Sequence, residues 1–155
     1  MIDTLLIFLR TGELGGVCIG MTRKAIQSLF GDPDDVGASA DIWLYGDQCN
    51  SNLQLTFAND RVCGIGVYFF GSTNPISLPD HLNAKLWAIN RETSVDELTG
   101  KLTNASVQWQ FYEPLTREDQ TCVLVESKIY CMWSHDKECM LQKIMLADNF
   151  IGDRR

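Results

Sequence analysis

Lysine and arginine are missing from a long stretch of this chain, between Ala25 and Asp60. The same stretch holds six aspartates, and the formal net charge of the whole chain is -7. Because contacts to phosphate groups need lysine and arginine, this distribution argues against a nucleic-acid ligand. The negative field would steer a cationic protein partner toward the stretch, unless the acids only keep a loop solvated. The six aspartates are Asp32, Asp34, Asp35, Asp41, Asp47 and Asp60.

Histidine is scarce as well, with only two residues, His81 and His135. Neither lies in a recognisable catalytic motif, so no Cys–His nucleophile pair is indicated. Cys131, His135 and Cys139 are spaced four apart and would share one face of a helix, where they could ligate zinc. However, the residues around Cys131 are typical of a strand, and no fourth ligand is evident. The sequence therefore predicts no catalytic residue, no metal site and no cofactor.

Long hydrophobic runs are also missing, and none reaches the length that crosses a membrane. The first ten residues contain a short apolar run, but neither a basic segment before it nor a small-residue cleavage site, so no export signal is predicted. We therefore expect a cytoplasmic protein whose six cysteines stay reduced. Several of them, such as Cys18, Cys63 and Cys122, alternate with apolar residues and are expected to act as small core side chains.

The chain has 155 residues, of which 45% are hydrophobic and 21% charged. This composition is ordinary for a globular protein and this length can bury a core without disulfides or metal. We expect one compact domain over residues 1–155, with two half-repeats over 17–71 and 92–146 as an open alternative. The segment 71–79, rich in turn-forming residues, is the candidate linker between the halves.

The same order of elements is expected twice. In the first half, Thr22 caps a helix that ends at Phe30, followed by a strand over 42–45 and a hairpin over 53–70. In the second half, Thr93 caps a helix to Leu102, followed by a strand over 107–111 and a hairpin over 122–133. Segments 81–89 and 140–146 are either helix or strand. The expected class is α+β, an antiparallel sheet with helices packed on one face, with two degenerate helix-plus-hairpin repeats.

Aromatic side chains on the expected strands are the best binding candidates, because tryptophan and tyrosine are enriched at interface hot spots. Alternation places about half of such residues in the core instead. Together with the acids, they give the predicted partner-binding set: Asp32, Asp34, Asp35, Asp41, Trp43, Tyr45, Asp47, Trp109, Phe111 and Tyr112.

The segment Gly20-Met21-Thr22-Arg23, with the helix that ends at Leu29-Phe30-Gly31-Asp32-Pro33, resembles the opening of two families of small bacterial domains. These are the outer-membrane assembly lipoprotein E family and the tandem-repeat β-lactamase-inhibitory proteins. The resemblance covers about residues 17 to 70, and the second half lacks both motifs. It implies a helix followed by an antiparallel sheet, and a protein-binding scaffold whose sheet face is the docking surface.

The leading hypothesis is a cytosolic bacterial protein-binding protein, specifically an immunity protein that neutralises a toxin by stoichiometric binding. Its carboxylates would pair with a basic toxin domain while aromatic side chains fill pockets on that partner. The alternative is an envelope-assembly or structural interaction module, and the third hypothesis is an enzyme. The partner would be a protein and neither a nucleic acid nor a membrane, and the oligomeric state is left open.

Overall fold

The structure, a computed structural model, describes residues 3–37, 39, 41–46, 52–69, 88–136 and 138–147. Over these ranges the chain forms three α-helices, a short 3-10 helix and eight strands, so the expected α+β class is confirmed. In chain order they are α1 Thr4–Thr11, α2 Arg23–Phe30, β1 Asp35–Val36, β2 Ile42–Tyr45, β3 Asn52–Ala58, β4 Arg61–Tyr68, α3 Val95–Asn104, β5 Trp109–Phe111, η2 Glu113–Leu115, β6 Gln120–Val125, β7 Ile129–Ser134 and β8 Met140–Ala147.

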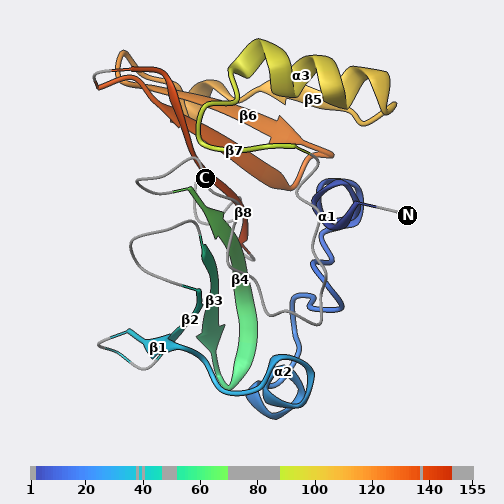
Figure 1. Cartoon of the computed structure of the whole chain (residues 1–155), viewed down its shortest axis with the longest axis vertical. Helices are drawn as coiled ribbons and strands as arrows, with labels where there is room; N and C mark the ends of the chain where they lie inside the picture. Colours follow the sequence, from blue (N-terminus) through green and yellow to red (C-terminus); the bar gives the residue numbers. More distant parts are fainter. Residues whose placement is uncertain are drawn as a thin grey trace.

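All eight strands join one antiparallel sheet in the order β1-β2-β3-β4-β8-β7-β6-β5 (Figure 1). Both expected hairpins are present in it, as β3–β4 and β6–β7. α2 precedes β1–β4 and α3 precedes β5–β8, so the two halves have the same element order. They meet where β4 pairs with β8, from Gly64 opposite Ala147 to Tyr68 opposite Lys143. Whether the halves are copies of one repeat stays a prediction.

Each α-helix begins at a capping side chain, which helps to explain why these short segments are helical. Thr22 Oγ1 accepts a hydrogen bond from the Ala25 amide at the start of α2, as expected, and Gly31 ends the helix with a positive φ of 79°. The expectation for α3 was one residue early, because Ser94 rather than Thr93 supplies the capping oxygen. Thr93 is buried instead, and its carbonyl accepts a hydrogen bond from Trp133 Nε1.

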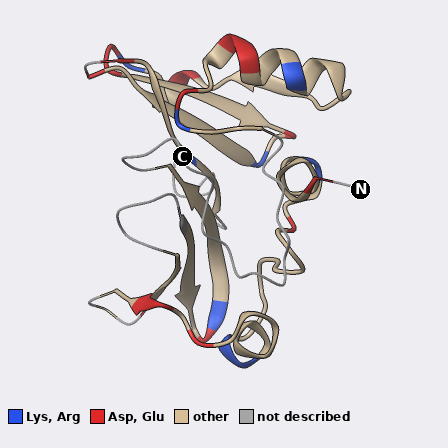
Figure 2. Ribbon diagram, viewed as in Figure 1, with Lys and Arg blue, Asp and Glu red and all other residues tan. Residues whose placement is uncertain are grey.

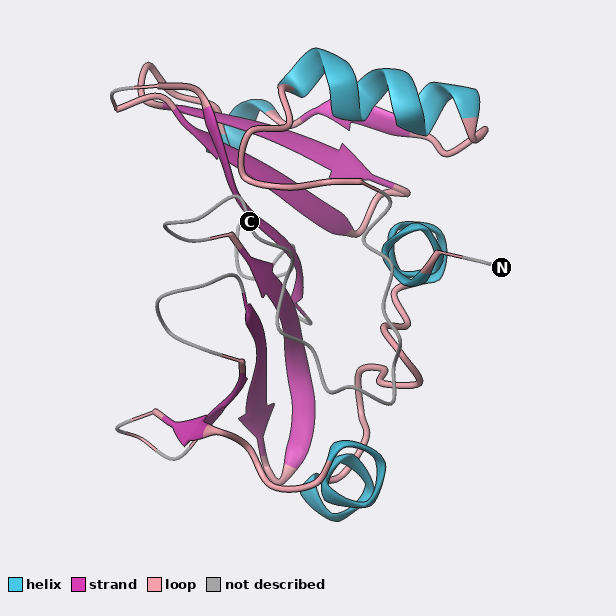
Figure 3. Ribbon diagram, in the orientation of Figure 1, coloured by secondary structure: helices cyan, strands magenta, loops and turns pink. Residues whose placement is uncertain are grey.

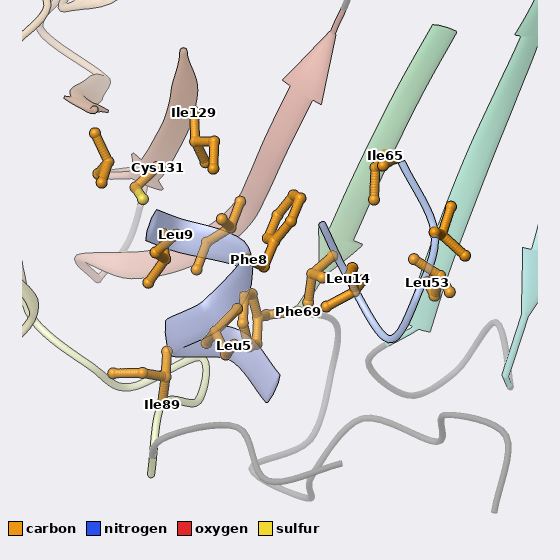
Figure 4. Packing of buried hydrophobic residues seen from close by; sticks show 14 of the residues in the cluster. Leu5, Phe8, Leu9, Leu14, Leu53, Ile65, Phe69, Ile89, Ile129 and Cys131 are labelled. Atoms are coloured by element: carbon orange, nitrogen blue, oxygen red, sulfur yellow. The ribbon is translucent and has the colours of Figure 1, made fainter. Parts of the chain in front are cut away.

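The three α-helices pack on one face of the sheet, here called the inner face (Figure 3). α2 contributes Ile26 and Phe30 to the core and α3 contributes Leu98 and Leu102. α1 lies between the two halves, where Leu5, Phe8 and Leu9 pack among side chains of both, including Leu53 and Ile65 of the first half and Ile129 and Cys131 of the second (Figure 4). α1 therefore fills the core at the junction of the halves.

The opposite, outer face differs between the halves. In the second half, Leu115 of η2 covers Cys122, Leu124, Tyr130 and Met132, which form a second buried cluster. At the junction of the halves, the outer face of β3, β4 and β8 has a hollow of about 250 Å³. Its floor includes Gly64 and Gly66, which have no side chains to fill it.

Some expectations concern residues outside the described ranges. These are the linker over 71–79 and most of the segment 81–89. Segment 140–146, left open as helix or strand, belongs to strand β8. None of the helices that the structure describes is long and apolar enough to cross a membrane.

Candidate functional site

Strand β5 forms one end of the sheet, and within the described ranges it pairs only with β6. The Glu126 amide donates to the Gln108 carbonyl, and the Tyr112 amide donates to the Cys122 carbonyl. In an antiparallel ladder the hydrogen-bonded residues alternate, so residues 108, 110 and 112 face β6. The backbone N–H and C=O groups of Trp109 and Phe111 therefore point away from the sheet, at its free edge.

The side chains of β5 make this edge aromatic. Phe111 is 53% exposed, and it is one of three large hydrophobic residues exposed in the described part of the chain. Its ring packs edge-to-face on Trp109, with ring centroids 5.5 Å apart and an angle of 88° between the planes. Trp109 is fixed from the other side, because its Nε1 donates a 3.0 Å hydrogen bond to Thr103 Oγ1 on α3. Trp109 thus supports Phe111 in a defined position.

The turn between α3 and β5 places these aromatic residues at the edge. Ser106 adopts a positive φ of 58°, and the Val107 amide donates to the Leu102 carbonyl. These bonds end α3 and direct the chain along β6. Val107 is buried, so the strand is anchored before its exposed residues begin.

Two hollows flank Trp109. One, of about 440 Å³, lies toward α3 and is lined by Thr103, Ser106, Val107, Gln108 and Trp109. The other, of about 90 Å³, is lined by Gln108, Trp109, Gln110, Leu124, Glu126 and Ser127. The edge therefore has room for side chains of an incoming segment next to its exposed backbone groups.

Carboxylates stand at both ends of β5. Glu126 lines the smaller hollow, and its Oε1 accepts a 2.8 Å hydrogen bond from the Gln108 amide. Glu113 begins the 3-10 turn two residues after Phe111 and is exposed. The aromatic edge thus lies between two negative groups.

Tyr112, predicted with Trp109 and Phe111, faces the outer side of the sheet. Its ring packs edge-to-face on Tyr130 with ring centroids 5.2 Å apart, as part of the outer cluster. Tyr112 is half-buried, so it holds η2 against β6 and β7 and leaves the exposed aromatic surface to Phe111.

The acidic residues predicted to bind a partner lie toward the β1 end of the sheet (Figure 2). Several of them already have partners. Arg23, from just before the basic-free stretch, lies 3.2 Å from Asp41 and 3.5 Å from Asp60. Asp34 accepts a hydrogen bond from the Gly46 amide, which joins two segments of the connection around β1 and β2. The premise of a stretch without nearby cations is therefore wrong in three dimensions, because the chain folds Arg23 onto it.

Two further acids of this set have local hydrogen bonds. Asp32 accepts one from the Gln27 side chain, and Asp35 accepts one from the Val36 amide. Both carboxylates remain exposed. Asp47 lies outside the described residues. A role for these acids in partner binding stays a prediction.

Trp43 and Tyr45 share the inner face, as their alternation indicated, and both pack in the first half of the core. Tyr45 is 2% exposed and its hydroxyl donates to the Gly31 carbonyl. Burial, and then the charges of Asp32 and Asp34, raise the pKa of Tyr45 to about 12. Trp43 packs against Phe57 with the Arg23 guanidinium 5.8 Å from its ring. Both side chains thus serve the interior of this half.

Two cysteines of the described ranges, Cys122 and Cys131, are buried in the sheet. Burial raises the pKa of Cys122 to about 12, and it raises the pKa of Cys131 as well. The thiols of Cys18 and Cys139 are exposed and form no disulfide with any other described cysteine. Cys131 lies on a strand and not on a helix, so the four-residue spacing to His135 and Cys139 does not bring these residues to one face. His135 instead contacts Thr121, with 2.6 Å between Nε2 and Oγ1.

No group of three or more potential metal ligands occurs within the residues that the structure describes. The β5 edge combines an exposed aromatic side chain, outward-facing backbone groups and two neighbouring hollows, and it is the candidate functional site.

No family model and no curated protein matches the chain. Two solved structures show a remote likeness at 11% identity. One is an extracellular protein containing an SCP domain from Bacillus anthracis str. Ames, with a TM-score of 0.45 and coverage of 84% of this chain and 44% of that one. The other is a cysteine-rich secretory protein from Staphylococcus aureus subsp. aureus Mu50, with a TM-score of 0.42 and coverage of 87% and 45%. The chain spans less than half the length of either protein.

The assignment to the β-lactamase-inhibitory proteins or the assembly lipoprotein E family is contradicted: no family model matches the chain, and the two solved structures reported above are an SCP-domain protein and a cysteine-rich secretory protein. The residues that suggested it act as caps of a short helix. Thr22 begins α2 and Gly31 ends it, and such caps occur in unrelated folds.

The hypothesis of a cytosolic immunity protein that neutralises a toxin is also contradicted, together with the cytoplasmic location. Both matched proteins are described as extracellular or secretory. The charge argument behind that hypothesis is weakened as well, because Arg23 pairs with Asp41 and Asp60.

Sequence reasoning identified Trp109 and Phe111 but missed the residues that give them a setting, namely Thr103, Gln108 and Glu126. It also missed that β5 is an edge strand. Alternation shows which face a residue lies on, whereas the strand order depends on pairings between distant segments. The only local indication that β5 is an edge strand was its short length between two turns.

Proposed function

We propose that this chain is a structural interaction module that acts by binding another polypeptide at the β5 edge. It corresponds to the alternative considered from the sequence, an envelope-assembly or structural module. The proposed function is binding without catalysis. Trp109 and Phe111 are the aromatic residues that would anchor the bound polypeptide. The observation that carries it is a large aromatic side chain, 53% exposed, at the free end of the sheet.

The free-energy argument concerns Phe111. Its exposed ring gains the most from burial in a partner, because apolar area removed from water contributes about 25 cal/mol per Å². Trp109 holds the ring, so little side-chain freedom is lost on binding. Rigid aromatic anchors of this kind are typical of interface hot spots.

Site-directed photo-crosslinking in the native host tests the proposal. A photoreactive phenylalanine analogue replaces Phe111 in one variant and Val36 in a matched control. Val36 is an apolar residue, 45% exposed, on the strand at the opposite end of the sheet. We expect one dominant protein adduct from position 111 and none from position 36.

The recovered protein is then purified and titrated against the wild-type chain, Phe111→Ala and Val36→Ala. Phe111→Ala should weaken binding by about 30-fold, the effect of a hot spot that contributes about 2 kcal/mol, and Val36→Ala should leave the affinity unchanged. Equal affinity for all three proteins, or an adduct from position 36 alone, would reject the β5 edge as the binding surface.

A further inference from the structure

We infer that the β5 edge binds its partner as an added strand, and that the occupant is an extended segment of a different protein with basic residues around an apolar one. This inference rests on the proposed function and specifies its mode of binding. It is carried by the direction of the backbone groups at the edge, by the two hollows beside Trp109, and by the carboxylates at both ends of the strand.

The backbone of β5 is already arranged as a template for a ninth strand. The bonds from Glu126 to Gln108 and from Tyr112 to Cys122 fix which residues face β6. Trp109 and Phe111 then present their N–H and C=O groups outward, at the spacing of alternate strand residues. Added strands in other complexes obtain their affinity from such main-chain bonds and their specificity from pockets for alternate side chains.

The side chains around β5 match this alternation. On the inner face, an incoming side chain would meet Phe111 and the hollow of about 440 Å³ next to Trp109. On the outer face, its neighbours would meet Gln110 and the hollow of about 90 Å³ that Glu126 lines. An apolar residue suits the inner position because of the exposed ring, and a cationic residue suits the outer position because of the carboxylate.

Charge complementarity decides between a foreign segment and a second copy of this chain. Glu113 and Glu126 lie at opposite ends of the edge, and the chain carries a net charge of -7. Two copies paired edge to edge would bring these like charges together, which costs free energy. A segment with lysine or arginine on either side of its apolar residue would instead neutralise both ends.

The opposite end of the sheet lacks this combination. β1 has only two residues, Asp35 and Val36, and one of them is acidic. Very short, charged edges are a common protection against strand addition. β5 is also short, with three residues, but its ends continue into Gln108 and Tyr112, which hold it to β6. The sheet therefore has one protected end and one end suited to a partner.

A synthetic peptide tests the mode of binding directly. It has about seven residues, alternates valine and lysine, and is blocked at both ends. Nuclear magnetic resonance of the complete, nitrogen-15-labelled chain follows each backbone amide during the titration. We expect the amides of Trp109 and Phe111 to shift and to exchange more slowly, whereas the Gln110 amide, already facing β6, changes less.

Two peptide controls leave the protein unaltered. Methylation of alternate peptide nitrogens, on the edge that would pair with β5, should abolish binding because it removes the donors. Replacement of the lysines by glutamate should weaken binding at least tenfold at low salt, and Glu126→Gln should weaken binding of the lysine peptide about threefold.

Two substitutions of Phe111 distinguish the contribution of its backbone N–H group to binding from that of its side chain. Phe111→Ala removes the ring and keeps the N–H group, whereas Phe111→Pro removes both. Proline is tolerated at an edge position whose N–H faces solvent, so both variants should unfold at similar temperatures. We expect the peptide to bind Phe111→Pro about fivefold more weakly than Phe111→Ala, the effect of one lost hydrogen bond.

Failure of this inference differs from failure of the proposed function. If both variants bind alike, or if the methylated peptide binds as well as its parent, strand addition is wrong while the crosslink at position 111 still supports the binding surface. If the unliganded chain sediments as a dimer and Phe111→Ala makes it monomeric, the occupant is a second copy and the inference is overturned.

Discussion

The two halves of this molecule share one element order and differ in how their strands are covered. In the first half, β1–β4 bury one face under α1 and α2, and over Gly64 and Gly66 the described part of the outer face is covered by side chains of the sheet itself, Thr56 and Tyr68. In the second half, β6 and β7 are buried on both faces, because η2 adds an outer layer. The strands at the two ends differ as well, with an acidic β1 and an aromatic β5.

This difference shows that connectivity alone does not determine which part of a sheet is available to a partner. The available part is determined by which residues occupy the equivalent positions of the two halves. In the first half the aromatic residues Trp43 and Tyr45 lie on a strand next to the edge strand and pack in the interior. In the second half Phe111 lies on the edge strand itself and stays exposed.

The largest expected effect contrasts two phenylalanines, one from each half. Phe30 is 8% exposed and packs on Tyr45 with ring centroids 5.4 Å apart. Phe30→Ala should lower the free energy of unfolding by about 3–5 kcal/mol, because it removes a core ring and leaves a cavity. Phe111→Ala should cost under about 1 kcal/mol, because its ring is half exposed. Urea unfolding measures both, and a similar cost for the two would remove the distinction between core and edge.

The second prediction concerns the outer layer that only the second half has. Leu115 is 3% exposed and packs in the outer cluster. Leu115→Ala should lower the free energy of unfolding by about 2–5 kcal/mol, the usual cost of truncating a core leucine. Thr56→Ala, at an exposed position on the outer face of β3, is the matched control and should change stability by about 0.5 kcal/mol or less. Chemical denaturation of both variants checks this, and a small cost at Leu115 would mean that η2 is not a structural layer.

The third prediction concerns the outer face of the first half. The Tyr68 ring lies over Gly66, where an added Cβ atom would come within 2.5 Å of Tyr68 Cε2. Gly66→Ala should therefore cost about 1–2 kcal/mol through displacement of the ring. In a Tyr68→Ala background the same change should cost much less, and a double-mutant cycle measures the coupling. Additive costs would show that the ring does not restrict this position.

The smallest effect concerns alkaline pH and belongs to the first half. The pKa of Tyr45 is raised to about 12, mainly by burial, while an unfolded tyrosine titrates near 10. Between these values the unfolded chain loses the proton first, so the wild-type protein becomes less stable as pH rises from about 10 to about 12. Tyr45→Phe should cost about 1 kcal/mol at neutral pH through loss of the bond to Gly31, and its stability should fall less steeply above pH 10. Thermal unfolding at several pH values compares the two slopes, and parallel slopes would contradict the assignment.

Much of the fold was predictable from local patterns. Capping at Thr22, the alternation over 53–57 and the turn at Asn59-Asp60 depend on neighbouring residues, so the sequence shows them directly. Segment 140–146 stayed ambiguous because its apolar residues follow neither period clearly. Its strand state is set by pairing with both β4 and β7, which are remote in the chain.

The candidate site was predictable only in part. Trp109 and Phe111 stood out as aromatic residues on one strand face, and that placement is correct. Their position at the end of the sheet depends on β8 lying between β4 and β7. The cation beside the acidic stretch was missed for a similar reason, since Arg23 reaches Asp60 only after the helix packs beside the β3–β4 turn.

The central place of β8 also sets the order in which the chain can fold. β4 lies early in the chain, but one of its two neighbours is β8, the last strand described. Residues 64–68 can therefore complete their pairing only after residues 143–147 have been synthesised. Pairings between such distant segments form slowly, because the entropy cost of closing the loop comes before the contacts that offset it. Until β8 arrives, β4 exposes an unpaired edge that other chains can join. A protein whose synthesis stops before Met140 would therefore be expected to aggregate and not to fold as a smaller sheet.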